Sequence, residues 1–135
     1  MKKLLVLLLS FGFFIPLSVE AEIVLYCQSE LATGFIKKNG SWEQTKFKSD
    51  RFTIKFNNDY SRLEGMTYIP MECKAPYKLL DQPELIYCVD SENSHSTLRY
   101  NKKTKRFVHY FQPYIGYIGN GTDTDVLYAG TCKAF

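Results

Sequence analysis

The sequence predicts an all-β fold, a small antiparallel up-and-down meander whose strands close into an eight-stranded barrel. Strand-like runs alternate with turn signals every eight to twelve residues, a spacing typical of β-barrels and β-sandwiches. Ten tyrosines and ten phenylalanines suit pleated sheets, where flat side chains pack across strands. Four cysteines are enough for two disulfides in such a domain. A sandwich with a different strand order is the alternative.

The N-terminus predicts export. Lys2 and Lys3 precede an apolar run over residues 4–15, and Ala21 places a small residue where a signal peptidase cleaves. A membrane-spanning helix needs about 20 apolar residues, so this run is too short to be one. We therefore expect residues 1–21 to be a cleaved signal peptide.

Cleavage after Ala21 leaves residues 22–135 as a single domain, with 15 basic and 13 acidic side chains. This balance requires neither a nucleic acid nor an anionic membrane as a partner. We expect no membrane span after cleavage. The short Met-Lys-Lys start looks bacterial, so we expect a periplasmic or extracellular protein of a Gram-negative bacterium.

Turn signals and alternation define the strands of the first half. Asn39-Gly40 lies between two extended runs and predicts a hairpin, because a type I′ turn needs positive φ at both central residues. Phe52, Ile54 and Phe56 alternate with polar residues and so share one face of a strand. The expected strands are residues 23–28, 33–38 after a kink at 32–34, 42–48, 51–56, and 63–71 with a bulge at Gly65.

The second half begins with a connection that contains Pro76 and Pro83. A hairpin follows, with its turn at residues 101–104. A further turn over residues 120–124 precedes the last strand. The expected strands are residues 85–89, 97–100, 106–112, 114–118 and 126–132.

The four cysteines predict two disulfides. In a closed eight-stranded meander the first and last strands become neighbours, so Cys27 and Cys132 lie in strands that meet. Cys73 and Cys88 flank one connection between sequential strands and form the natural second pair. Four cysteines allow two other connectivities. A zinc site would need closer spacing, since the shortest gap here is fifteen residues.

No catalytic or metal motif stands out. His95 lies in a polar loop and His109 among aromatic residues, and both are interpreted as structural or surface histidines. Asp123 and Asp125 follow an Asn-Gly-Thr turn, but the run lacks the calcium-loop pattern and reads as a hairpin turn. We therefore expect a non-enzymatic protein without metal or cofactor.

Two stretches are candidates for a contact surface. The more basic one lies at and beside the second hairpin tip and comprises Arg99, Lys102, Lys103, Lys105 and Arg106. It could contact an acidic partner, such as an exported protein or an acidic glycan, or be an ordinary solvated turn. In the glycine-rich stretch 111–121, Tyr114 and Tyr117 could line a protruding loop or cap the core.

A cysteine in the opening strand, Cys27, and another near the C-terminus, Cys132, give a layout that resembles the small periplasmic lysozyme-inhibitor barrels of bacteria. The resemblance covers architecture only, and the inhibitory loop motif of that family aligns with no stretch here. We expect a binding or inhibitor module that acts through surface loops. The alternative is a carrier that holds a small apolar ligand in a cavity lined by Phe52, Ile54 and Phe56.

Overall fold

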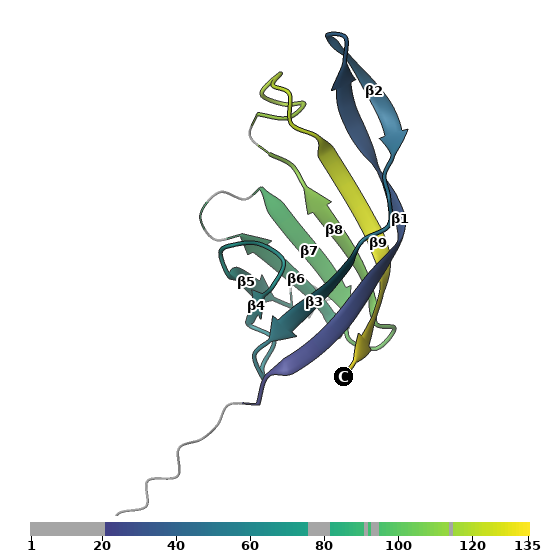
Figure 1. Cartoon of the computed structure of the whole chain (residues 1–135). Helices are drawn as coiled ribbons and strands as arrows, with labels where there is room; N and C mark the ends of the chain where they lie inside the picture. Colours follow the sequence, from purple (N-terminus) through teal and green to yellow (C-terminus); the bar gives the residue numbers. More distant parts are fainter. Residues whose placement is uncertain (1–20, 76–81, 91, 93–94, 114) are drawn as a thin grey trace, which may run out of the picture.

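Nine β-strands make up the secondary structure of the described residues (Figure 1). The computed structural model describes residues 21–75, 82–90, 92, 95–113 and 115–135. The strands are β1 (Ile23–Lys38), β2 (Ser41–Lys46), β3 (Arg51–Phe56), β4 (Arg62–Glu64), β5 (Met71–Lys74), β6 (Leu85–Asp90), β7 (Ser96–Asn101), β8 (Arg106–Phe111) and β9 (Asp125–Ala134). The predicted signal peptide, apart from its last residue, and the segment 76–81 lie outside the described residues.

The strands form a closed antiparallel barrel, as the sequence predicted. From β3 to β9 each strand pairs with the next, β3 also pairs with β1, and β9 returns to pair with β1. β1 and β3 to β9 are thus the eight strands of the barrel, and β2 is an extra strand attached to β1. Closure satisfies the backbone groups that a free edge would expose.

The long strand β1 connects the barrel to a projecting arm. One edge of β1 pairs with β3 in its first part and with β2 in its last part. The other edge pairs with β9. The register with β9 shifts between Ser29 and Leu31, which makes Glu30 the extra residue of a β-bulge. A bulge bends a strand and increases its twist. The kink expected at residues 32–34 is therefore a bulge slightly earlier in one continuous strand.

The β1–β2 hairpin projects beyond the barrel (Figure 1). Its two turn residues, Asn39 and Gly40, have φ values of 49° and 84°, which confirms the predicted type I′ geometry.

Two predicted strands are wrong. The run 63–71 is two strands, since β4 ends at Glu64 and pairs with β5 through Leu63 and Met71. Gly65 has a φ of 95°, and a Cβ there would lie 2.5 Å from the Thr53 carbonyl oxygen, so the chain turns where a bulge was expected. The expected strand 114–118 is also absent, because residues 115–118 form turns, while Tyr114 lies outside the described residues.

Both predicted disulfides are present, Cys27–Cys132 and Cys73–Cys88. In each pair the two cysteines face each other directly across neighbouring strands, β1 with β9 and β5 with β6. Two disulfides indicate an oxidising compartment of the kind that exported proteins occupy. None of the described residues belongs to a helix long and apolar enough to cross a membrane.

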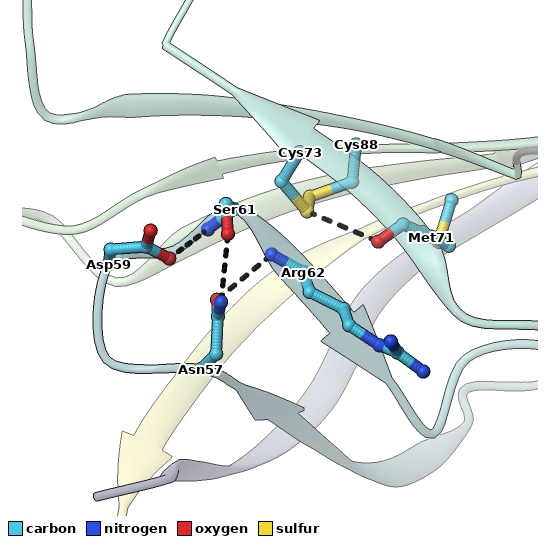
Figure 2. Close-up of a disulfide and its surroundings, with 7 residues drawn as sticks. All are labelled: Asn57, Asp59, Ser61, Arg62, Met71, Cys73 and Cys88. Atoms are coloured by element: carbon cyan, nitrogen blue, oxygen red, sulfur yellow. Dashed lines mark hydrogen bonds between the residues drawn. A yellow bond between two sulfur atoms is a disulfide. The ribbon is translucent and has the colours of Figure 1, made fainter. Parts of the chain in front are cut away.

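A hydrogen-bonded turn lies beside the second disulfide (Figure 2). The Asn57 side chain donates to the Ser61 hydroxyl at 2.8 Å and accepts from the Arg62 amide at 2.9 Å. The Ser61 amide donates to the Asp59 carboxylate, and bonds from Ser61 lower the pKa of that carboxyl group. The Ser61 carbonyl accepts from the Cys73 amide at 2.8 Å, so the turn is tied to the disulfide-bearing strand.

Aromatic and aliphatic side chains fill the described part of the barrel interior. Phe56 stacks on Tyr100 with ring centroids 5.5 Å apart, and Phe52 meets Phe107 edge-on at 5.3 Å. Phe56 and Ile54 are fully buried. The side chains that the carrier hypothesis placed around a cavity therefore pack against core neighbours. Burial, with a smaller contribution from Tyr60, raises the pKa of Tyr100 to about 12.

Candidate functional site

The two candidate contact stretches lie at opposite ends of the barrel. The basic turn connects β7 to β8, whereas Tyr117 lies in the connection from β8 to β9 (Figure 1). β8 runs from one end to the other, so the two stretches belong to separate surfaces. Tyr114 lies outside the described residues.

The basic stretch is itself divided between two surfaces. Asn101 builds the turn, because its side-chain oxygen accepts hydrogen bonds from the Lys103 and Thr104 amides at 2.9 Å. Lys103 and Lys105 are exposed at this tip, and the Lys102 ammonium group lies 5.1 Å from the centroid of the Tyr60 ring. Arg99 and Arg106 lie on β7 and β8 instead.

Three aromatic rings meet at the projecting end of the molecule. Tyr117 lies 5.8 Å from Phe35 of β1 and 5.3 Å, edge-on, from Trp42 of β2, measured between ring centroids. Phe35 remains 45% exposed and Tyr117 remains 56% exposed. We call Phe35, Trp42 and Tyr117 the aromatic end.

Polar contacts hold the aromatic end together. The Lys37 ammonium group donates to the backbone carbonyl and to the side-chain oxygen of Asn120, both at 3.1 Å. It also lies 5.8 Å from the centroid of the Trp42 ring. On the other side, the Tyr117 amide donates to the buried Asp125 carboxylate at 2.6 Å. The hairpin and the connection between β8 and β9 are therefore fixed relative to each other.

Sequence reasoning singled out Tyr117 but missed its two aromatic neighbours. Lys37 and Trp42 are direct partners across the hairpin, and Phe35 lies two residues before Lys37 in the same strand. Alternation along the predicted hairpin could have placed Phe35, Lys37 and Trp42 on one face. It could not have shown that Tyr117, from another part of the chain, packs there.

His109 and Ser96 form a buried pair inside the barrel. The Ser96 hydroxyl lies 2.7 Å from Nε2 of His109, whose ring stacks on Tyr128 with centroids 5.9 Å apart. A hydroxyl beside an imidazole is the arrangement of a nucleophile and its base. Ser96 is completely buried and His109 nearly so, which places the pair in the core and not on the surface. A purely structural role for His109 stays a prediction.

Burial lowers the pKa of His109 from its ordinary value of 6.5 to about 4. The unfolded chain therefore binds more protons than the folded protein between these values, and stability falls as the pH falls through this window. We expect the free energy of unfolding to drop by about 2.5 kcal/mol between pH 7.5 and 4.5 from this group alone. Urea denaturation at a series of pH values measures this change in the free energy of unfolding.

The His109→Gln variant should lose this part of the pH dependence, because glutamine does not titrate. His95→Gln is the matched control and should keep it, since His95 lies in a loop outside the core. If the free energy of unfolding of His109→Gln depended on pH as steeply as that of the unaltered protein, the pH dependence would not come from His109.

Acidic side chains do not assemble into a metal centre in the described part of the chain. There, no group of three or more histidine, cysteine, aspartate or glutamate side chains is placed to hold a metal ion. The Asp125 carboxylate accepts the Tyr117 amide, and the Asp123 amide donates to the Ile115 carbonyl. These contacts organise the turn that precedes β9.

Comparison with known proteins identifies no relative: no family model, no curated protein and no solved structure matches this chain. The resemblance to lysozyme-inhibitor barrels thus stays one of layout.

Proposed function

We propose that this protein is an exported, non-enzymatic binding module that engages a protein partner through the aromatic end. One observation carries the proposal: the Tyr117 ring contacts both Phe35 and Trp42 of the projecting hairpin, yet Phe35 and Tyr117 stay about half exposed. Rings that served only the core would be buried inside the barrel, as Phe56 is.

Exposed aromatic side chains are typical of binding sites. Tyrosine and tryptophan are enriched among the residues that contribute most to protein interfaces, and contiguous exposed apolar surface marks interaction sites. The contacts of Lys37 with Asn120 and of Tyr117 with Asp125 hold the rings before a partner arrives. A rigid surface loses less conformational entropy on binding than a flexible one.

The projecting shape favours a concave partner surface. A hairpin arm that carries apolar rings and a central ammonium group can enter a cleft, and a module that fills the cleft of an enzyme acts as an inhibitor. The oxidising compartment indicated by the two disulfides fits the periplasm or the medium of a Gram-negative bacterium. Partners are therefore sought among exported proteins of the same cell or of its surroundings.

Site-specific photo-cross-linking tests the proposal in the producing bacterium. With a photoreactive phenylalanine in place of Phe35, we expect one discrete cross-linked product, identified by mass spectrometry. Adding Trp42→Ala should abolish the product while leaving the thermal unfolding curve nearly unchanged, because Trp42 lies outside the barrel core.

The matched control places the same photoreactive group at Tyr68. Tyr68 is a fully exposed tyrosine in the loop between β4 and β5, away from the projecting arm (Figure 1). It should give no product. The same product from both positions, or a product from position 35 that survives Trp42→Ala, would sink the proposal.

A further inference from the structure

A second surface lies on the barrel wall, on the outer face of β7, β8, β9 and β1. Arg99 faces Val108, Val108 faces Ala129, and Ala129 faces Leu31, so four side chains form one row across four strands. Val108 is 40% exposed and Leu31 is 71% exposed. These residues line a cleft of about 450 Å³, which we call the wall cleft.

Two arginines lie along the wall cleft. Arg99 and Arg106 both line it, and the described residues place no carboxylate within ion-pair distance of either guanidinium group. Arg99 lies over the Tyr87 ring, 5.8 Å from its centroid, which orients its side chain. The acidic residue in the lining is Glu30, whose carboxylate accepts a hydrogen bond from the Thr131 hydroxyl at 3.0 Å.

The opposite side of the barrel differs in character. On the outer faces of β3 and β4, Lys55 lies 3.4 Å from Glu22 and Arg62 lies 3.3 Å from Glu64, whereas Arg51 has no ion pair among the described residues. The wall cleft thus differs by holding two guanidinium groups together, neither with an acidic partner among the described residues, beside the exposed aliphatic side chains of Val108 and Leu31.

We propose that the wall cleft binds an acidic peptide segment of a protein partner. A carboxylate of the segment pairs with Arg99 and Arg106, because a guanidinium group matches a carboxylate with two parallel hydrogen bonds. A neighbouring apolar side chain of the segment covers Val108 and Leu31 and removes their surface from water. The proposal does not rest on the aromatic end, which is a separate surface.

Two arginines could attract several kinds of polyanion, but the exposed aliphatic side chains of Leu31 and Val108 favour a peptide. A sulfated glycan or a nucleic acid would use the positive charge but has no aliphatic group to place on Leu31 and Val108. A peptide that alternates acidic and apolar residues supplies both. The three basic residues of the adjacent turn, Lys102, Lys103 and Lys105, add to the attraction for any anion, so charge alone does not identify the ligand.

Titration of the ¹⁵N-labelled protein with defined probes tests the proposal. The probe is a blocked six-residue peptide that alternates leucine and glutamate. Comparison peptides replace leucine by serine, which keeps the charge, or glutamate by glutamine, which keeps the apolar groups. We expect the leucine–glutamate peptide to shift the amide signals of Leu31, Val108 and Ala129, and each comparison peptide to bind roughly tenfold more weakly or worse.

Variants then assign the binding to the named side chains. Arg99→Gln with Arg106→Gln should weaken the leucine–glutamate peptide roughly tenfold or more. Leu31→Ser should weaken it without a change of charge. The matched control, Lys46→Gln with Arg51→Gln, removes two exposed positive charges elsewhere and should leave the affinity within twofold.

Each outcome decides the matter. The proposal is overturned if the leucine–glutamate peptide does not bind, if the serine–glutamate peptide or a heparin fragment binds as tightly, or if the control variant loses as much affinity. Trp42→Ala should leave peptide binding unchanged. A failure here is therefore distinguishable from a failure of the aromatic end.

Discussion

Replacing Cys27 and Cys132 by alanine is expected to lower the free energy of unfolding by about 4 to 5 kcal/mol. This disulfide joins residues 105 positions apart, so its loss releases a large amount of conformational entropy in the unfolded chain. It also links β1 to β9, the strand pair that closes the barrel. Urea denaturation of both proteins at neutral pH measures the difference.

The second disulfide is the internal control. Cys73 and Cys88 are 15 positions apart, and replacing both by alanine should cost about 3 kcal/mol, since a shorter loop restrains the unfolded chain less. Both bridges connect directly facing residues on paired strands, so local geometry hardly differs between them. A larger loss from the Cys73–Cys88 bridge would contradict the chain-entropy explanation.

The Phe56→Ala variant is expected to lose about 3 to 5 kcal/mol of stability. Phe56 is completely buried, and its ring packs between Tyr60, at 5.0 Å, and Tyr100, at 5.5 Å. Alanine would remove these contacts and leave a cavity that the surrounding strands can fill only in part. The measurement is again the free energy of unfolding in urea.

Phe35→Ala is the matched control for this prediction. The same side chain is removed, but from a position that is 45% exposed at the aromatic end, so the expected loss is below about 1 kcal/mol. Equal losses from both variants would mean that Phe56 does not hold the core together. That result would reopen the hypothesis of a hollow, ligand-carrying interior.

The wall cleft and the aromatic end illustrate how one small barrel can carry two surfaces. Strand pairing fixes the wall, so Arg99, Val108, Ala129 and Leu31 lie in one row across four paired strands. The aromatic end is built from a hairpin and a connection, and side-chain contacts fix it. Binding residues commonly occur on such connections when a rigid scaffold positions them.

Local patterns predicted much of the fold. Strict alternation identified residues 51–56 as a strand, and Asn39-Gly40 identified the hairpin turn, because both signals depend only on neighbouring residues. The cysteine pairing followed from topology, since closing a meander brings its first and last strands together. Local patterns failed at Gly65, where close approach to the Thr53 carbonyl, distant in sequence, accompanies a turn instead of a bulge.

The candidate surfaces depended on tertiary structure. The sequence grouped Arg99 and Arg106 with three lysines because they are close along the chain, but strand alternation places the arginines on the wall and the turn places the lysines at its tip. Likewise Phe35, Trp42 and Tyr117 meet because the connection from β8 to β9 packs Tyr117 against the β1–β2 hairpin. The sequence by itself determined an all-β chain with two disulfides. Packing between distant segments decided where side chains gather on its surface, because such contacts leave no periodic signal in the sequence.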